Sequence, residues 1–278
     1  MVNDKMSFQH QRESDVKFHS KVKTYPDGKV EILAANRPIF GPSGWEQSNK
    51  WDSEKRKPRD GSGDVDRAKR RAAAKIRDIA LCNAFRYFVT LTLSAEQVNR
   101  YEIGPVLAKM RTWLDNRVRR CGLKYVLIPE YHKDGAIHFH GFFNDVLPVA
   151  DSGAVKIPGQ KRPKKPRSAA ELGNLLENGA VKLYNLPDWA LGFSVAMPLY
   201  GDYNAAIAYV CKYVTKAGKK IGGRWYYSGG ALALPEVSFA DASADELEAT
   251  GAYAFDIPAA GLRLAIWRGD SNNADGDC

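Results

Sequence analysis

Two histidines separated by a single residue offer the clearest candidate chemistry in this sequence. His138 and His140 flank Phe139 in residues 136–144, a segment that predicts a β-strand. Side chains on a strand point alternately to its two faces, so both imidazoles are expected on one face and Phe139 in the core. Two neighbouring imidazoles can chelate one cation. A His-x-His pair can also simply decorate a strand, so the triplet alone leaves both interpretations open.

Glu130 is the expected third ligand of such a cation. Residues 124–130 also predict a strand, and the HKDG turn at residues 132–135 should pair it with the histidine strand as a hairpin. Glu130 then lies across the hairpin from the histidines. Two imidazoles and a carboxylate suit a divalent ion that acts as a Lewis acid, either Mn²⁺ or Mg²⁺. His132, beside the turn, is a secondary candidate.

A predicted helix at residues 203–216 carries two tyrosines and two lysines at regular spacing. Tyr209 and Tyr213 are four residues apart, so both phenols share one face of the helix, about 5–6 Å apart at Cβ. Lys212 and Lys216 each follow a tyrosine by three residues and should lie beside it. A phenol, with a pKa of about 10, becomes a useful nucleophile when a metal polarises its target phosphate and a cation stabilises the developing charge. The same pattern also fits an amphipathic helix with half-buried tyrosines and solvated lysines.

These motifs, in their chain order, resemble those of the HUH endonucleases, which are named for a His-hydrophobic-His triplet. Residues 88–92 (FVTLT) are similar to the family's first motif, residues 138–140 to the second and residues 209–216 to the third. The resemblance covers residues 84–228 and is to the rolling-circle replication initiators, in the two-tyrosine form of phage gene A initiators. Relaxases of conjugative plasmids place the tyrosine before the histidines, which is the opposite order.

The resemblance implies an α+β fold: a central antiparallel sheet (a ferredoxin- or RRM-like palm) with the histidines on its middle strands and helices packed on it. It also implies that a tyrosine attacks a phosphate of single-stranded or hairpin origin DNA. A 5′-phosphotyrosine link forms, a free 3′-hydroxyl is left to prime synthesis, and the strand is later religated. Tyr209 is expected to act first and Tyr213 second, with Lys212 and Lys216 assisting. Several relatives keep a third metal ligand where Glu130 stands.

The net charge of the chain favours a polyanionic partner. The formal charge is +9 and the pI is about 9.3, which is typical of proteins that bind nucleic acid. This charge is concentrated in a predicted helix at residues 64–84, which Asp64 could cap, and in a basic loop at residues 150–170. The expected phosphate contacts are Arg67, Arg70, Arg71 and Lys75 on the helix, with Lys69 beside them, and Lys161, Arg162, Lys164 and Lys165 in the loop.

Three regions are predicted along the 278 residues. Residues 1–83 form an extension with a hairpin, which turns at residues 26–28, and the basic helix; residues 84–230 form the catalytic domain; and residues 231–278 form an acidic, alanine-rich tail with one strand at 262–267. There is no P-loop motif, so unwinding is expected to need a host helicase and synthesis a host polymerase. The sequence has no signal core or membrane-spanning run, so the expected location is the cytoplasm of a bacterial host.

Composition narrows the class of protein further. Hydrophobic residues make up 44% of the chain, which is enough to bury a core and argues against wholesale disorder. Four cysteines with no CxxC pair favour neither a zinc knuckle nor a disulfide framework. Two alternatives to a replication initiator remain: a two-tyrosine transposase or mobilisation relaxase with the same chemistry, and a non-catalytic DNA-binding module of the same fold. Metal-dependent cleavage of origin oligonucleotides would separate the enzymes from the binding module.

Overall fold

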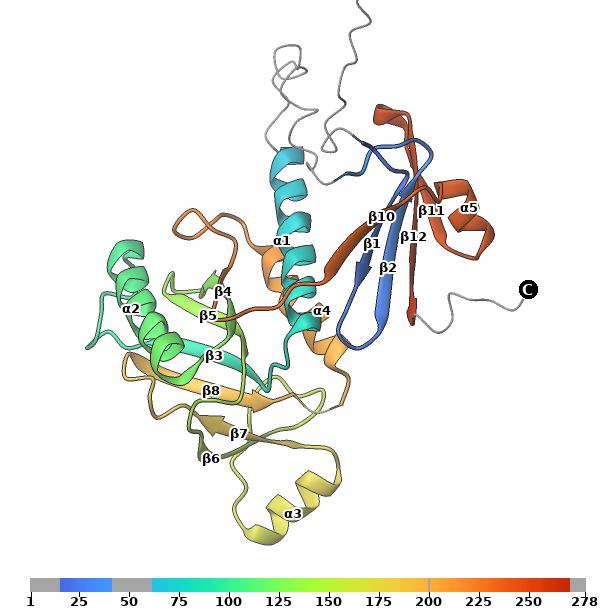
Figure 1. The fold of residues 1–278 in the computed structure, drawn as a ribbon. Helices are drawn as coiled ribbons and strands as arrows, with labels where there is room; N and C mark the ends of the chain where they lie inside the picture. Colours follow the sequence, from blue (N-terminus) through green and yellow to red (C-terminus); the bar gives the residue numbers. More distant parts are fainter. Residues whose placement is uncertain (1–15, 42–61, 200, 271–278) are drawn as a thin grey trace, which may run out of the picture. The chain divides into compact units, whose positions relative to one another are not determined.

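Two compact units make up the computed structural model (Figure 1). One unit spans residues 61–233 and contains all of the candidate catalytic residues, and the other combines residues up to 60 with those from 234 onward. Each unit contains an antiparallel sheet and at least one helix, so the fold is α+β, as expected. None of the helices that the structure describes is long and apolar enough to cross a membrane. The described residues are 16–41, 62–199 and 201–270.

Seven antiparallel strands form the sheet of the unit at residues 61–233. They are β3 (Tyr87–Leu93), β4 (Tyr125–Tyr131), β5 (Ile137–Phe143), β6 (Ala150–Lys156), β7 (Val181–Asn185), β8 (Gly192–Pro198) and β9 (Tyr227–Gly229). In space they follow the order β6-β7-β8-β3-β5-β4-β9, so β5, which carries the two histidines, is an interior strand. The strands expected at 86–93, 124–130 and 136–144 are confirmed as β3, β4 and β5, to within one residue at each end.

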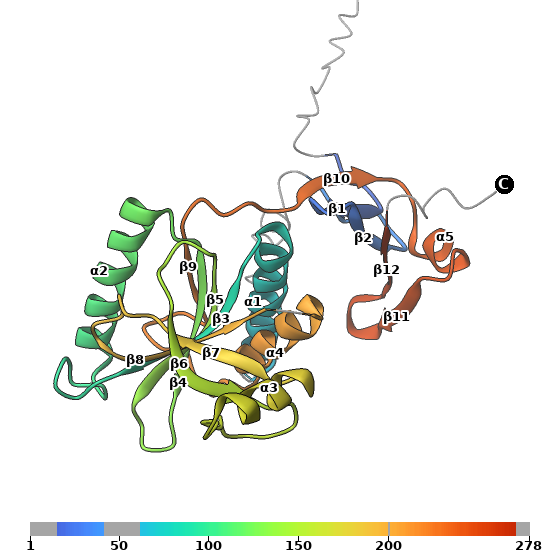
Figure 2. The same ribbon diagram turned by 90° about the horizontal axis from the view of Figure 1, so that it is seen from below.

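Helices cover both faces of this sheet (Figure 2). On one face, Phe139 of β5 packs in a core cluster with Leu114. On the other face, Ile128 of β4 packs with Ile76 and Val210. These residues belong to α2 (Ile103–Cys121) on the first face, and to α1 (Ser62–Cys82) and α4 (Tyr203–Lys216) on the second. His140 pairs directly with Ile128, so the histidines share the face that α1 and α4 cover.

The helices expected at residues 103–121 and 203–216 are confirmed with the same bounds. Gly122 ends α2 in the left-handed conformation, with φ 69°. The Asp202 side chain caps α4 by accepting a hydrogen bond from the backbone N–H of Ala205 at 3.0 Å. The expectation that Asp64 caps α1 is wrong, because the helix already includes Ser62 and Asp64 lies in its first turn.

Residues 150–170, expected to be a basic loop, are only partly so. Residues 150–156 form β6, which pairs with β7 and buries Val155. Ser168 then caps α3 (Ala169–Glu177) by accepting a hydrogen bond from the backbone N–H of Glu171. The expectation failed for β6 because its residues are mostly small and polar, and because pairing with β7, which was also not expected, supplies its backbone partners.

The other unit is a five-stranded sheet in the order β10-β1-β2-β12-β11. The expected hairpin is confirmed as β1 (Ser20–Thr24) and β2 (Lys29–Ala35), joined by a turn in which Gly28 has φ 83°. The later strands are β10 (Glu236–Ala240), β11 (Tyr253–Ile257) and β12 (Leu262–Asp270), and one helix, α5 (Ala244–Ala249), packs on the sheet.

The structure divides the chain differently from the expected three regions. Residues 236–270 are not a tail, because they supply three of the five strands that complete the hairpin's sheet. Ala34 of β2 and Ala265 of β12 are directly paired and fully buried, in a cluster with Leu247 of α5. The basic helix α1 belongs instead with residues 61–233, since its apolar side packs against α4. An alanine-rich sequence hid this sheet because small side chains carry little strand signal.

Candidate active site

The strand β5 presents His138 and His140 on one face of the sheet, as expected. Both side chains are partly buried, and Phe139 between them is fully buried in the core on the opposite face. The next residue, Gly141, lies so close to β4 that a Cβ atom there would overlap the carbonyl oxygen of Val126. A residue without a side chain therefore allows β4 and β5 to approach closely beside the second histidine.

Two threonines of the neighbouring strand β3 hold the imidazoles. The strands pair so that Thr90 faces His140 and Thr92 faces His138. The Thr90 hydroxyl lies 3.1 Å from Nδ1 of His140, and the Thr92 hydroxyl lies 3.2 Å from Nδ1 of His138. A hydroxyl can donate or accept, so each Nδ1 keeps a partner in either tautomer. Each Nε2 is left for a further ligand.

The carboxylate of Glu130 reaches His140 from β4. Its Oε2 lies 3.1 Å from Nε2 of His140, although the strand register places Glu130 opposite His138. A carboxylate oxygen and an imidazole nitrogen at this separation could share a cation, so both fit the expected ligand set. Across the described residues, however, no three His, Cys, Asp or Glu side chains gather into a metal-binding cluster. The complete set with His138 is thus not preassembled.

Burial controls the protonation of these groups. Burial, and secondarily the nearby His138, lowers the pKa of His140 to about 4. Burial also lowers the pKa of His138 and raises the pKa of the Glu130 carboxyl. Both imidazoles are therefore neutral at neutral pH, which is the form that binds metals. The contact between His140 and Glu130 is accordingly a hydrogen bond to a neutral ring.

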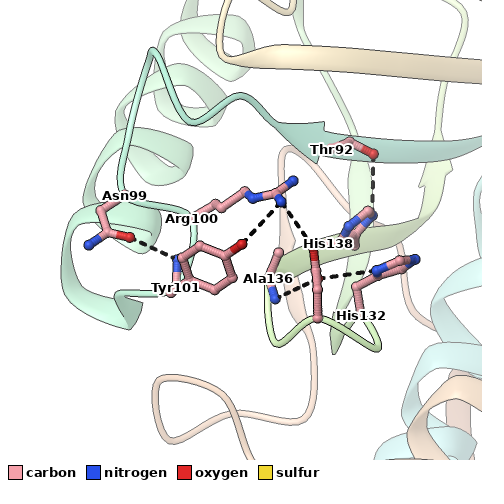
Figure 3. Close-up of polar contacts among 8 residues, drawn as sticks. Thr92, Asn99, Arg100, Tyr101, His132, Ala136 and His138 are labelled. Carbon is pink, nitrogen blue, oxygen red and sulfur yellow. Dashed lines mark hydrogen bonds and ion pairs between the residues drawn. The ribbon is translucent and has the colours of Figure 1, made fainter.

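The turn between β4 and β5 supports His138 (Figure 3). The ring of His132 stacks on that of His138, with centroids 4.8 Å apart. Nδ1 of His132 lies 3.2 Å from Oδ1 of Asp134, whose Oδ2 accepts a hydrogen bond from Arg100 at 2.9 Å. In this structure His132 is thus a stacking partner of His138, and its secondary role as a metal ligand stays a prediction.

The two tyrosines of α4 meet beside His140. The Tyr213 ring lies nearly parallel to the His140 ring, with centroids 4.4 Å apart and an interplanar angle of 14°. Its phenolic oxygen lies 2.9 Å from that of Tyr209. Tyr209 packs edge-on against Phe88 of β3 and keeps half of its surface exposed. The structure therefore brings both expected nucleophiles to the expected histidine strand.

The phenols of α4 lie in different environments. Burial, and then the hydrogen bond with Tyr209, raises the pKa of Tyr213, so Tyr213 keeps its proton. Tyr209 is the more exposed of the two and is open to a DNA strand. A third tyrosine on the helix, Tyr203, donates a hydrogen bond to the carbonyl oxygen of Ala80 at 2.9 Å, and burial raises its pKa to about 12. Tyr203 therefore anchors α4 to α1.

The two lysines of α4 are exposed. Lys216 lies near the candidate ligand Glu130: burial raises the pKa of that carboxyl, and the charges of His132 and Lys216 partly oppose the effect. Lys212 lies one turn earlier on the helix. The placement of Lys216 is thus toward the carboxylate, and the assistance expected from both lysines stays a prediction.

The basic residues expected to contact phosphate lie at the surface, with two of them already paired. Arg67 of α1 forms an ion pair with Asp64 at 3.1 Å, and Lys164 forms one with Glu171 at 2.6 Å. The ammonium of Lys69 lies 5.5 Å from the ring centroid of Trp225. The exposed remainder consists of Arg70, Arg71 and Lys75 on α1 and Lys161, Arg162 and Lys165 in the loop after β6.

Sequence reasoning missed the residues that hold the imidazoles and the tyrosine. Thr90 and Thr92 were part of a quoted motif, but their contacts with the histidines were not expected. The signal was present, because Thr-x-Thr and His-x-His have the same spacing and paired strands bring alternate residues face to face. Nothing in the sequence indicated that Phe88 packs against Tyr209, since that contact joins a strand to a distant helix.

One comparison with known proteins is positive. Residues 86–218 match the family model for replication-associated proteins of the ORF2 and gene 2 protein type. The matched segment begins just before β3 and ends just after α4, so it includes both threonines, both histidines, Glu130 and both tyrosines. No curated protein and no solved structure matches the chain. The family match supports a replication-associated role, of the initiator kind, for the part of the chain that carries the site.

Proposed function

We propose that this protein is a two-tyrosine HUH endonuclease that initiates rolling-circle replication by nicking single-stranded or hairpin origin DNA. The observation that carries the proposal is the stacking of Tyr213 on His140, with the Tyr209 hydroxyl in hydrogen-bond contact. A nucleophile must lie beside the group that activates its target, and this arrangement provides that proximity. The match to replication-associated proteins spans the same residues and supports the proposal independently.

The reaction is a transfer of a phosphate ester to tyrosine. The phenolic oxygen bonds to the scissile phosphorus as the bond from phosphorus to the 3′-oxygen breaks. The phenol loses its proton and the departing 3′-oxygen gains one, which leaves a 5′-phosphotyrosine and a free 3′-hydroxyl. In religation a 3′-hydroxyl attacks the same phosphorus and the tyrosine departs, so one ester replaces another and no external energy source is needed.

Tyr209 acts first in this proposal. It is half exposed, whereas Tyr213 keeps its proton and lies with its hydroxyl 2.9 Å from the Tyr209 oxygen. The Tyr213 hydroxyl can therefore donate a hydrogen bond to the charge that develops on Tyr209. Tyr213 then serves as the second nucleophile for strand transfer, when the Tyr209 oxygen is occupied by DNA.

His140, Glu130 and His138 are the residues that would hold a divalent cation. The donors fit, because both imidazoles are neutral and both have Nδ1 engaged by a threonine, which leaves Nε2 for a metal. Bound Mn²⁺ or Mg²⁺ would withdraw charge from the scissile phosphate as a Lewis acid. Lys216, near Glu130, adds positive charge on the same side, and Lys212 is proposed to assist.

The partners follow from the same proposal. The substrate is single-stranded or hairpin DNA, held by the exposed basic residues of α1 and of the loop after β6. Unwinding and synthesis fall to a helicase and a polymerase of the host, in the cytoplasm of a bacterium. A two-tyrosine transposase would share the nicking step and would differ in joining the cut strand to a new site.

Covalent capture tests the proposal. The protein is mixed with Mn²⁺ and a pool of randomised single-stranded oligonucleotides, and adducts that survive denaturation are isolated and sequenced. Tyr209→Phe should abolish the first adduct, while Tyr213→Phe should still form it but lose strand transfer. Tyr203→Phe is the matched control, because its hydroxyl bonds the backbone of α1 and lies outside the reaction. Adduct formation by the Tyr209→Phe, Tyr213→Phe double variant would place the nucleophile elsewhere. DNA binding by the wild type without any adduct would favour a non-catalytic binding module.

A further inference from the structure

A cavity of about 390 Å³ opens beside Glu130 and is not used by the reaction described above. The end of β4 contributes Glu130 and Tyr131 to its lining, and the end of α4 with the loop that follows contributes Lys216 and Lys219. All of these residues lie within the unit at 61–233. The cavity therefore shares one residue, Glu130, with the candidate metal site.

The lining of this cavity combines an aromatic ring, two cations and apolar surface. The ammonium of Lys219 lies 4.9 Å from the centroid of the Tyr131 ring. Lys216 and Lys219 are exposed, so both charges are open to an entering ligand. Pro129 and Ile221 are buried and complete the lining with apolar atoms. An apolar ligand would leave the ammonium groups without a partner, and a small anion would leave the ring unused.

We propose that this cavity binds one nucleotide of the single strand next to the scissile phosphate. The base stacks on Tyr131, and a backbone phosphate lies between Lys216 and Lys219. The inference rests on the proposed function, which brings a strand to His140 and Glu130. Because Glu130 borders both the metal site and the cavity, a phosphate at the first places its neighbouring nucleotide at the second.

The size and chemistry of the cavity agree with a nucleotide. Its volume falls in the range of roughly 300–1,000 Å³ that is usual for small-ligand sites. Stacking of a base on a tyrosine ring tolerates any base, because every base has an aromatic face. The Lys219 ammonium, which already lies near the ring, can move toward the phosphate as the base enters. The subsite thus positions the strand for cleavage without reading its sequence.

The test separates the base from the backbone in a binding measurement. Full-length protein in EDTA, where no cleavage occurs, is titrated against two fluorescein-labelled probes and followed by anisotropy. One probe is oligothymidylate of roughly 20 nucleotides, longer than a typical binding footprint, and the other is an abasic phosphodiester chain of equal length. The variants are Tyr131→Ala, Tyr131→Phe and Lys219→Gln. Lys220→Gln is the control, because it removes the same charge one residue away, from a lysine that lies 5.8 Å from the Trp225 ring and does not line the cavity.

Tyr131→Ala should weaken binding of oligothymidylate about tenfold and leave the abasic chain almost unchanged, while Tyr131→Phe retains the affinity. Lys219→Gln should weaken both probes and lower the salt slope by roughly 0.7, and Lys220→Gln should do less. Equal losses for both probes with Tyr131→Ala, or wild-type affinity, would overturn the proposal. If Tyr131→Ala does not fold, the lysines decide, since equal effects of Lys219→Gln and Lys220→Gln also overturn it.

The outcomes also distinguish this proposal from the function on which it rests. If the wild type binds neither probe and forms no adduct with any single strand, the proposed function and the subsite both fail. If the wild type binds and forms the adduct while Tyr131→Ala behaves like the wild type, only the subsite fails.

Discussion

Each imidazole has two nitrogens, and the strand next to the histidines determines which of them is free. Thr90 and Thr92 occupy Nδ1 of His140 and His138, so Nε2 is the atom that each ring can offer to a cation. A metal ligand of this kind must carry its remaining proton on Nδ1, and the threonine oxygen can accept it. The threonines therefore set the direction from which a metal can be bound.

Removing either hydroxyl should weaken metal binding. Thr90→Val and Thr92→Val keep the shape of the side chain but leave Nδ1 without a partner, so we expect the affinity for Mn²⁺ to fall about 10- to 100-fold in calorimetric titrations. Thr90→Ser retains a hydroxyl and should bind nearly as the wild type does. Thr215→Val, which alters an exposed threonine bonded to its own helix, is the control. Unchanged affinity in both valine variants would show that the threonines only pack.

The stability of the metal-free protein should depend on pH through His140. Burial holds its folded pKa at about 4, compared with 6.5 for an exposed imidazole, so below pH 6.5 the unfolded chain binds the extra proton first. Stability is therefore full above about pH 6.5 and falls as the pH drops to about 4, by at most about 3 kcal/mol. Urea unfolding in EDTA at several pH values measures this. A His140→Gln variant should show a flatter curve over that window, and an equally steep one would assign the effect to other groups.

At this scale the sequence identified reactive groups better than their supports. His138, His140, Tyr209 and Tyr213 could be selected because their types are rare and their spacing matches a strand or a helix. The diagonal reach of Glu130 to His140 could not be predicted, since it depends on a side-chain conformation. Whether all three ligands bind one ion stays a prediction.

At the scale of elements, the site depends on how closely β4 and β5 approach each other. Gly141 follows His140, and its missing side chain makes room for the backbone of Val126. Backbone atoms of an interior strand cannot move aside without shifting their hydrogen-bonded neighbours. The spacing of these two strands therefore also sets the position of Glu130 relative to His140.

A methyl group at this position should be poorly tolerated. In Gly141→Ala the new Cβ would overlap the Val126 carbonyl oxygen, so we expect the free energy of unfolding to fall by about 2 kcal/mol or more, measured by urea denaturation. Gly173→Ala is the matched control: it lies in α3 with open space around it and should raise stability by about 0.5–1 kcal/mol. Similar stabilities for Gly141→Ala and the wild type would mean that the strands separate easily.

The elements that the sequence predicted well are those with a strong local pattern. The helices α2 and α4 have apolar residues at helical spacing, and β3 is aromatic and β-branched, so their bounds were predictable. By contrast β6, β10 and β11 were missed. Their sequences are short, polar or alanine-rich, and they exist as strands because distant partners complete their hydrogen bonds.

At the scale of the whole molecule, positive charge is the main expected means of holding DNA. Arg70 and Arg71 lie on α1, on the face of the sheet that carries the histidines, whereas α2 carries Arg119 and Arg120 on the opposite face. All four are exposed. This arrangement provides a matched comparison, because the two pairs carry the same charge on opposite faces of one sheet.

Neutralising the two pairs should have unequal effects. Arg70→Gln with Arg71→Gln should reduce the affinity for single-stranded DNA and lower the slope of log affinity against log salt by roughly 1.4, about 0.7 for each lost phosphate contact. Arg119→Gln with Arg120→Gln should change the slope little. Anisotropy titrations at several salt concentrations measure both. Equal slope changes would mean that DNA is attracted by total charge and has no preferred face.

The pairing of β2 with β12 joins segments from opposite ends of the described chain, such as Ala34 and Ala265. During synthesis the β1–β2 hairpin emerges early, and its partner strand is translated roughly 10 to 50 seconds later at ordinary ribosomal rates. A two-stranded hairpin alone is at best marginally stable, so it waits unfinished throughout that interval. All residues of the unit at 61–233 leave the ribosome in the meantime. A ribosome that stalls before residue 262 therefore releases a chain with every residue of the candidate active site and an incomplete second sheet, which gives quality-control proteases a means to recognise the unfinished product.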